Sequence, residues 1–363
     1  MASLHIKSLF LNMGKTVPKN FERFNSSTAR KLLYTEYGDP LEVVKLVPAE
    51  LKEPQSDEVL IQLIAAPVNP ADINTIQGKY PSKPPLPAVP GNEGVGKIIR
   101  VGANASKEFA EGDRVIPLSS NLGTWQTHLL LPKDCVLKLP RKVQTAQAAT
   151  LTVNPCTAFR MLRDFADLQP GDTVIQNGAN SACGQNVIQI CRAWGLRSVN
   201  IVRNRPNISE LKQYLIKLGA NYVLTEEELR TNDLFKSGLL HKPKLALNCV
   251  GGKNALECLR HLDNGSTMVT YGGMSREPLS IPTAALIFKD LKFKGFWMTR
   301  WTKDNFNSVD RFEMLSELIS MMTSNELEAP AHMMIKFDDY KEALKNTLNM
   351  QGMIGKKFIL DFE

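Results

Sequence analysis

The chain from about residue 157 to residue 300 alternates short apolar runs with segments whose apolar residues recur at helical spacing. DTVIQN (172–177) is typical of a buried strand. Four apolar residues of the next segment share one helix face: Val187, Ile190, Cys191 and Trp194. Gly195 follows where that helix would end. The alternation continues through KLALNCV and STMVTYGG. Strands that alternate with one-sided helices predict an α/β fold with a Rossmann-type, doubly wound parallel sheet over residues 158–300.

Residues 31–157 have a different texture, in which short apolar runs are split by Gly-Asp, Asn and Pro turn signals, as in EYGDPLEVVKL and VGKIIRVGANA. This pattern predicts a strand-rich, barrel-like domain with few helices. APVNPADINTIQGKYP (66–81) is interpreted as a polar loop that carries Tyr80. Residues 301–363 hold a helical stretch at about 308–325 and a closing strand, KKFILDF, and we expect this tail to return to the first domain.

The first 30 residues are basic, poor in acids and rich in hydroxyl side chains, with five Lys or Arg against one Glu. This composition favours an organellar transit peptide over a disordered basic tail. The leader accounts for +4 of the net charge of +7, and the rest of the chain has no block of like charge. A nucleic-acid partner is therefore not indicated. No run of about 18 apolar residues occurs, so no membrane span is expected.

The sequence gives little sign of metal or disulfide chemistry. The six cysteines form no Cys-x-x-Cys pair, and we expect them to be reduced and mostly in the core. The five histidines form no cluster, and the 66–81 segment contains neither Cys nor His. No metal site is expected. Without a metal, the group that handles developing negative charge must be another acid, and a neutral tyrosine can donate a proton or a hydrogen bond at pH 7.

A nucleotide site is indicated where the first strand of the parallel sheet meets its helix. NGANSACG (177–184) supplies small residues there, but Ala179 and Ser181 stand where a strict fingerprint has glycine, so an ordinary tight turn is the alternative. About twenty residues later, RNRP places Arg203 and Arg205 where an acid would bind a ribose hydroxyl. Arginine at this position accommodates a 2′-phosphate, which predicts NADPH rather than NADH.

Several stretches together resemble one family: NPADINTIQGKYP, PGNEGVG, NPCTAFRML, VIQN, LNCVGGK, MVTYGGM and FKDLKFKGFW. The chain resembles the zinc-free medium-chain dehydrogenase/reductase superfamily and, within it, the mitochondrial trans-2-enoyl-CoA (enoyl-acyl carrier protein) reductases. The resemblance runs from about residue 31 to the end. It implies a GroES-like catalytic domain (31–157, completed by 301–363), a Rossmann domain, mitochondrial fatty acid synthesis and a homodimer formed through edge strands of the cofactor domains.

The resemblance also assigns roles to residues. It makes Tyr80 the proton donor in the reduction of an enoyl-CoA or enoyl-acyl carrier protein. It implies these NADPH contacts: Asn154, Asn180, Ser181, Ala182, Cys183, Arg203, Asn204, Arg205, Tyr271, Gly272, Gly273, Met274, Phe296, Trp297, Met298 and Lys357. The chain departs from close relatives in NSACG, where alanine and cysteine stand in place of glycine and valine, and in RNR, whose middle residue is uncharged.

Other interpretations stay open at this stage. Tyr80 as packing over a cleft is the alternative to catalysis, and Trp297 is interpreted as lining an acyl pocket or as sheet core. Four basic residues near Trp297 have three alternative interpretations: contacts with coenzyme A phosphates, contacts with an acidic carrier protein, or a solvated strand face. They are Lys292, Lys294, Arg300 and Lys303. An NADPH quinone reductase is the rival enzyme, and a catalytically idle nucleotide-binding regulatory protein is the rival of another class. Acyl chain length, the natural carrier and the leader's cleavage site stay open.

Overall fold

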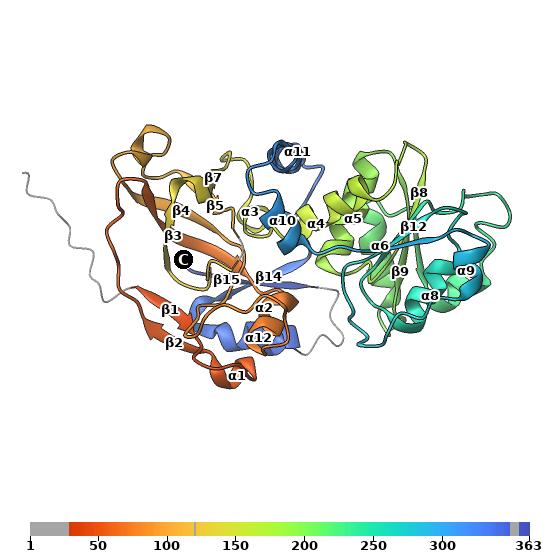
Figure 1. Ribbon diagram of the computed structural model, residues 1–363, viewed down its shortest axis with the longest axis horizontal. Helices are drawn as coiled ribbons and strands as arrows, with labels where there is room; N and C mark the ends of the chain where they lie inside the picture. Colours follow the sequence, from red (N-terminus) through yellow and green to blue (C-terminus); the bar gives the residue numbers. More distant parts are fainter. Residues whose placement is uncertain (1–28, 120, 349–355) are drawn as a thin grey trace, which may run out of the picture.

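The computed structural model describes residues 29–119, 121–348 and 356–363, so the predicted leader, apart from its last two residues, lies outside the described residues (Figure 1). Within those ranges the strands form sheets of two, six and seven strands. Figure 1 shows two lobes, one built around each large sheet. Among the described residues, no helix combines the length and apolarity needed to cross a membrane.

The six-stranded sheet is entirely parallel. Its strands are β8 (Thr173–Asn177), β9 (Arg197–Val202), β10 (Tyr222–Thr225), β11 (Leu245–Asn248), β12 (Thr267–Thr270) and β13 (Lys292–Gly295). Their spatial order is β10-β9-β8-β11-β12-β13, so the direction of winding reverses between β8 and β11. This is the strand order of dinucleotide-binding sheets, and the predicted Rossmann-type fold is confirmed.

Helices cover both faces of this sheet. They are α4 (Asn154–Asp164), α5 (Ala182–Ala193), α6 (Ile208–Lys217), α7 (Glu226–Thr231), α8 (Gly252–Arg260) and α9 (Thr283–Ile287). The predicted apolar face of α5 is confirmed, because Val187, Ile190 and Cys191 are fully buried in one core with α4 and β8. Gly195 has φ +70°, a left-handed conformation that ends the helix. Helices α7, α8 and α9 pack on the opposite face of the sheet.

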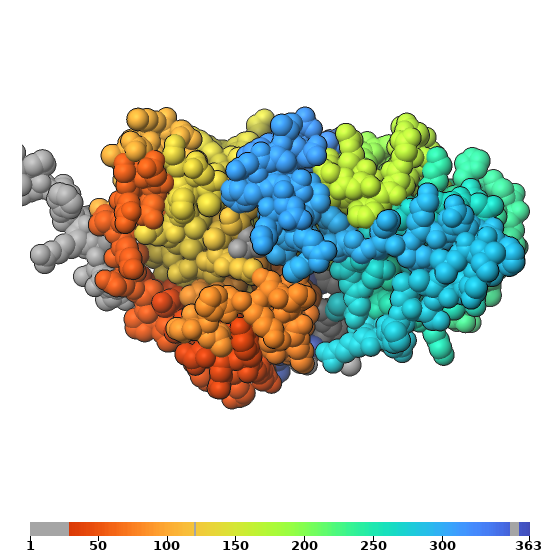
Figure 2. All heavy atoms as spheres, viewed as in Figure 1, coloured from red at the N-terminus to blue at the C-terminus, as the bar shows by residue number. Residues whose placement is uncertain are grey.

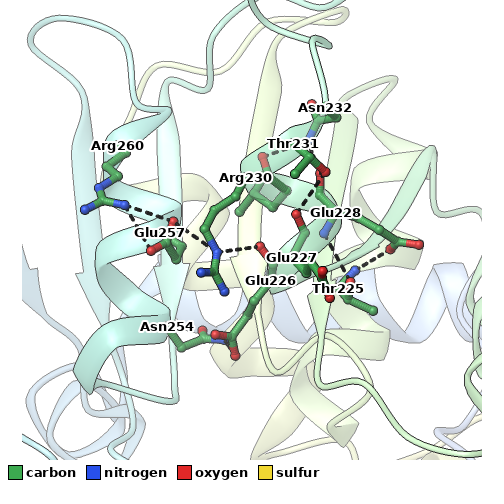
Figure 3. A network of polar contacts seen from close by, with 11 residues as sticks. Thr225, Glu226, Glu227, Glu228, Arg230, Thr231, Asn232, Asn254, Glu257 and Arg260 are labelled. Atoms are coloured by element: carbon green, nitrogen blue, oxygen red, sulfur yellow. Dashed lines mark hydrogen bonds and ion pairs between the residues drawn. The ribbon is translucent and has the colours of Figure 1, made fainter.

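A polar network joins α7 to α8 on the outside of this face, as Figure 3 shows. Thr225 caps α7, because its side chain accepts the amide of Glu228 while the Glu228 carboxylate accepts the amide of Thr225. Asn254 of α8 donates to Glu226 at 2.6 Å. Thr225 pairs with Val202, the residue before Arg203, so the network begins at the same carboxyl edge of the sheet as the predicted cofactor residues. We assign these contacts the structural role of fixing α7 against α8.

The other lobe contains a two-stranded antiparallel ribbon and a seven-stranded mixed sheet. The strands β1 (Arg30–Leu33) and β2 (Lys45–Pro48) form a ribbon. The seven-stranded sheet, counted over the described residues, contains β3 (Glu58–Pro67), β4 (Val95–Val101), β5 (Arg114–Pro117), β6 (His128–Pro132), β7 (Val136–Lys138), β14 (His332–Lys336) and β15 (Lys357–Asp361). Among the described strands of this sheet, only β14 and β15 pair in parallel. Strand β15 pairs antiparallel with β3, with Ile359 opposite Pro67, so the C-terminal chain lies in this lobe (Figure 1).

Short helices of this lobe are α1 (Pro40–Val43), α2 (Pro70–Ile76), α3 (Thr145–Ala149) and α12 (Tyr340–Leu348), with the 3-10 helices η2 (Ala105–Lys107), η3 (Lys133–Cys135) and η4 (Phe337–Asp339). Helix α2 corrects the interpretation of 66–81 as a loop. Asn69 is its N-cap, Pro70 is its first residue, and the Asp72 carboxylate accepts the Asn69 amide at 2.8 Å. Asn-Pro-x-Asp is therefore a helix start here rather than a turn.

Two further helices lie between the lobes in Figure 1, α10 (Met298–Asp304) and α11 (Val309–Thr323). Helix α11 confirms the helical stretch predicted near 308–325. Strand β13 ends at Gly295, and the chain turns into α10 with Trp297 as its N-cap. Cys135 is half-buried and the other five cysteines are buried, which confirms that most of them lie in the core; none of the six forms a disulfide.

Candidate active site

The carboxyl ends of β8 and β11 are joined where the sheet reverses its winding. Asn177 donates to the Asn248 side-chain oxygen at 2.8 Å, and the Asn177 oxygen accepts the amide of Cys249 at 2.8 Å. Asn248 also accepts the amide of Gly251 at 3.0 Å. Doubly wound sheets bind ligands in the crevice outside this reversal, so the fold itself locates a ligand site here.

The predicted pyrophosphate loop forms one wall of this crevice. It leaves β8 through Gly178, which has φ +58°, and enters α5 at Ser181, whose hydroxyl accepts the amide of Gly184 at 3.1 Å. A side chain at position 184 would place its Cβ 2.6 Å from the carbonyl oxygen of Ala179. The backbone turn is therefore tight, and it directs the N-terminus of α5 toward the crevice, where an anion is favoured. Ala182 and Cys183 form the first turn of α5.

The predicted 2′-phosphate residues follow β9 directly. Arg203 and Asn204 are exposed, and Arg205 is partly buried, with its Nε donating to the Arg203 carbonyl at 3.3 Å. Partial burial lowers the pKa of Arg205, and the neighbouring Arg203 charge lowers it further. The charges of Arg203 and Arg205 are close enough to interact, which favours a ligand with more than one negative charge.

The predicted residues after β12 face the same loop. The amide of Tyr271 donates to the Asn248 carbonyl at 2.9 Å, and burial raises the pKa of its phenol well above the usual range, with the thiols of Cys183 and Cys249 beside it. A Cβ at Gly272 would meet the Cys249 carbonyl at 3.1 Å, whereas one at Gly273 would meet nothing within 4 Å. Gly273 and the exposed Met274 therefore present open backbone at the strand end.

Tyr80 is brought against Trp297 from the other lobe. The two rings make an edge-to-face contact with centroids 5.8 Å apart, and the indole Nε1 donates to the Tyr80 oxygen at 2.7 Å. Backbone bonds to helix α2 hold the tyrosine, because its amide donates to the Asn74 carbonyl at 3.1 Å. Phe296, one residue before Trp297, donates its amide to the Thr270 carbonyl of β12 at 3.0 Å.

The phenol of Tyr80 is protonated at neutral pH. Burial raises its pKa, and the hydrogen bond from Trp297 lowers it in part. An indole N–H only donates, so it uses a lone pair of the Tyr80 oxygen and leaves the phenol proton out of that bond. The arrangement is that of a fixed neutral acid. Both interpretations of Trp297, as lining of an acyl pocket and as sheet core, are compatible with this arrangement. The structure adds a direct contact between Trp297 and Tyr80.

A buried polar network supports the Tyr80 side of the site, and sequence reasoning missed most of it. Lys357, buried on β15, donates to the Asn69 side-chain oxygen, and Asn69 donates to the Glu93 carboxylate at 2.9 Å. Asn154, the first residue of α4, lies 3.4 Å from the same Asn69 oxygen. Glu93 also accepts the amide of Val153 at 3.0 Å. Two predicted cofactor residues, Asn154 and Lys357, therefore meet at one buried asparagine.

The carboxyls of this network are strongly perturbed. Burial raises the pKa of Asp72 to about 6, and hydrogen bonds from Asn69 and Asn92 and the Lys357 charge oppose the shift. Burial likewise raises the pKa of Glu93 to about 7, opposed mainly by Lys357. Burial lowers the pKa of Lys357, although both acids counteract this. One sequence feature could have indicated these buried acids: Asp72 in NPAD and Glu93 in PGNEGVG each lie next to an apolar, strand-like run.

A pocket opens beside this network between α4, α10 and α11. Its apolar wall consists of Leu118, Val153, Cys156, Met298, Met314 and Leu315. Asn92, Thr302 and Arg311 add polar groups. Met298 directly follows Trp297 in the chain. Figure 2 shows a hollow between the lobes, bordered by the orange chain around α2 and the cyan chain after β12. Among the described residues, no group of three or more His, Cys, Asp or Glu side chains is placed to hold a metal ion.

Comparison with known proteins places this site in a class. Residues 55–141 match the model of the alcohol dehydrogenase GroES-like domain, and residues 182–317 match that of the zinc-binding dehydrogenases. A GroES-like lobe joined to a Rossmann sheet defines a medium-chain dehydrogenase/reductase. The chain is 47% identical over 351 residues to the enoyl-[acyl-carrier-protein] reductase, mitochondrial, of Rattus norvegicus, covering 96% of this chain and 92% of the relative. The chain belongs to the mitochondrial enoyl-[acyl-carrier-protein] reductase family, as the sequence predicted.

Two further comparisons agree. The human protein of the same name is 48% identical, with 91% of this chain and 88% of the relative covered. The structure of Etr1p with NADP and crotonyl-CoA superposes with a TM-score of 0.85 at 34% identity, covering 92% of this chain and 99% of that chain. Etr1p is named as a mitochondrial 2-enoyl thioester reductase of Candida tropicalis. The family is thus supported by sequence and by fold.

Proposed function

We propose that the chain reduces trans-2-enoyl thioesters, carried by coenzyme A or acyl carrier protein, to saturated acyl thioesters with NADPH, within mitochondrial fatty acid synthesis. The observation that carries the proposal is the neutral phenol of Tyr80, held by Trp297 and paired with a dinucleotide-type crevice. The curated relatives are named mitochondrial enoyl reductases, and the Etr1p structure holds NADP and crotonyl-CoA. These names support the enoyl substrate over a quinone and over a regulatory role.

The residues of the crevice fit NADPH. The tight turn at Gly178 and Gly184 would hold the pyrophosphate at the N-terminus of α5, and Arg203 with Arg205 would hold the 2′-phosphate. The open backbone at Gly273 would leave room for the nicotinamide half. When bound, NADPH supplies a hydride to the β-carbon of the enoyl group.

Tyr80 completes the reduction. Hydride addition at the β-carbon moves electrons toward the thioester carbonyl, and the resulting enolate needs a proton at its α-carbon. A phenol kept neutral by burial can stabilise that charge with a hydrogen bond or give up its proton. Trp297 restricts the phenol to one orientation, which such a step requires.

We place the acyl chain at the pocket between α4, α10 and α11, which at about 20 Å³ has to widen to admit it. Its apolar wall begins at Met298, beside Trp297, and continues to Met314 and Leu315 on α11. Arg311, buried at this pocket, already donates to the Phe306 carbonyl at 2.9 Å and lies 4.7 Å from the Phe306 ring. Its charge is thus engaged by the protein, and the pocket suits an uncharged tail.

The carrier would lie outside this pocket. Arg300 on α10 lies 5.5 Å from the Trp297 ring, and Lys303 is exposed on the same helix. Two cations next to the pocket suit phosphate groups, which coenzyme A and the prosthetic arm of acyl carrier protein share. Lys292 and Lys294 are instead on β13, an edge of the parallel sheet.

The edge strand β13 supports a homodimer. Three neighbouring apolar side chains at the end of α9 are exposed: Leu286, Ile287 and Phe288, the last by 78%. Contiguous exposed apolar residues next to an unpaired strand edge favour association with a second copy. A dimer formed there would leave the hollow between the lobes accessible.

The test is crotonyl-CoA reduction by purified Tyr80→Phe, with NADPH oxidation by a quinone measured in parallel. We expect kcat to fall by about 10² or more, because a lost catalytic acid normally costs that much. A rate within about twofold of wild type would remove Tyr80 from the mechanism. Faster oxidation by the quinone than by crotonyl-CoA would favour the quinone reductase, and tight NADPH binding without turnover of either would favour the regulatory protein.

A further inference from the structure

Helix α5 uses a polar face to hold the chain that joins α11 to β14. Gln185, Gln189 and Arg192 share this face at helical spacing. Gln189 accepts the amide of Glu328 at 2.8 Å, and Arg192 donates to the Glu326 carbonyl at 2.7 Å. Both glutamines are fully buried. Side chains of the Rossmann lobe therefore hydrogen-bond to the backbone of residues 326–331, the segment that leads into the other lobe.

Gln185 differs from its neighbours because it also contacts the cofactor loop. Its Nε2 donates to the Asn180 carbonyl at 2.8 Å, and its Oε1 accepts the amide of Ala331 at 2.9 Å and the hydroxyl of Tyr214 at 2.9 Å. One amide side chain thus joins the loop proposed for the pyrophosphate to the residue that precedes β14.

The connection continues to the catalytic side. The Ala331 carbonyl accepts the amide of Lys357 at 2.7 Å, and the Lys357 ammonium donates to Asn69, the N-cap of α2. Tyr80 is tied to α2 through Asn74. A continuous path of hydrogen bonds and short backbone segments therefore runs from the cofactor loop to the helix that holds the phenol.

We propose that Gln185 is a positioning residue that couples the cofactor loop to the Tyr80 lobe. The inference rests on the proposed function, in which the hydride comes from one lobe and the proton from the other. Misplacement of reacting groups by about 1 Å can cost about 10²-fold in rate, so a fixed link between the lobes has a direct catalytic consequence. Gln189 grips the same segment without touching the loop, so it provides the matched control.

The test compares Gln185→Met with Gln189→Met, which replace buried amides by apolar chains of similar length. We expect Gln185→Met to weaken NADPH binding and to lower kcat for crotonyl-CoA, each by about tenfold, the effect of roughly one lost buried hydrogen bond. Gln189→Met should lower the unfolding midpoint about as much as Gln185→Met does. Its NADPH affinity and its kcat for crotonyl-CoA should stay within about twofold of wild type. Equal kinetic effects in the two variants, or none in Gln185→Met, would overturn the coupling.

A second measurement needs no variant. In the wild-type protein, NADPH should slow amide hydrogen exchange at residues 326–331 by several fold, and adenosine alone, which has no pyrophosphate, should not. NADPH binding without slower exchange would overturn the coupling and leave the proposed function intact. Failure of the wild-type protein to bind NADPH would overturn both. Slower exchange in a protein that does not reduce crotonyl-CoA would support the coupling and remove the proposed reaction.

Discussion

Replacing Glu93 with glutamine should change how stability depends on pH. The Glu93 carboxyl is buried, and its pKa is raised from 4.5 to about 7. Between these values the folded protein holds a proton that the unfolded chain has released, so this stabilising contribution is complete below pH 4.5 and is lost as pH rises through 7. A shift of 2.5 pKa units corresponds to about 3 kcal/mol.

Glutamine does not titrate, so the variant does not lose this unfolding free energy as pH rises. We expect the unfolding free energy of Glu93→Gln to rise relative to wild type by about 3 kcal/mol between pH 4.5 and pH 8. At every pH the variant should also lose about 1–3 kcal/mol of unfolding free energy, because the glutamine N–H₂ group would face the donor of Asn69 or Val153 and one buried hydrogen bond would be lost. The pH-dependent part separates titration from the lost hydrogen bond.

Urea unfolding at pH 5, 6, 7 and 8, extrapolated to water, measures this difference. Glu111→Gln serves as the control, because Glu111 is exposed in the turn before β5. Its curve should run parallel to that of wild type. A Glu93→Gln difference that stays constant within about 0.5 kcal/mol, or that falls as pH rises, would refute the assignment of a raised pKa to Glu93.

Three further outcomes are expected. Trp297→Phe keeps the ring contact but removes the N–H donor, so kcat for crotonyl-CoA should fall about tenfold, less than in Tyr80→Phe; an unchanged kcat would count against its role in orienting the phenol. Arg203→Ala and Arg205→Ala should each lower kcat/KM for NADPH at least tenfold and leave that for NADH nearly unchanged, and equal losses with both cofactors would contradict the 2′-phosphate assignment. Phe288→Glu should shift the protein toward monomer in sedimentation velocity, whereas Val309→Glu, an equally exposed site on α11, should not; a shift in both would argue against a specific β13 interface.

The parallel lobe was accessible to sequence reasoning because its signals are local and repeated. The apolar face of α5 and the left-handed Gly195 follow from helical periodicity and termination alone. Helix α2 was missed, because Pro70 and Asn69 are typical of turns as well as of helix starts. Only the reciprocal bond to Asp72 distinguishes the two cases, and that bond depends on the folded backbone.

The candidate site divides in the same way. Tyr80 and Arg203 were selected because family motifs or spacing mark them. Arg203 directly follows β9 as predicted, whereas Tyr80 follows helix α2, which was not predicted. The pairing of Tyr80 with Trp297 joins residues more than two hundred positions apart, which no periodicity reports. Asp72 and Glu93 were missed because acids are normally exposed, and their burial depends on Lys357 arriving from the far end of the chain.

The position of β15 has a consequence for biogenesis. This strand lies between β14 and β3, and its register with β3 joins positions about 290 residues apart. During translation the parallel sheet is complete while this last strand is still inside the ribosome. The amino-terminal half must then wait for β15, because β6 pairs with β3 only over Glu58–Gln62 and leaves the Ala65–Pro67 end of that edge unpaired. A premature stop that removes only the last few residues should therefore leave a nucleotide-binding half beside an aggregation-prone one.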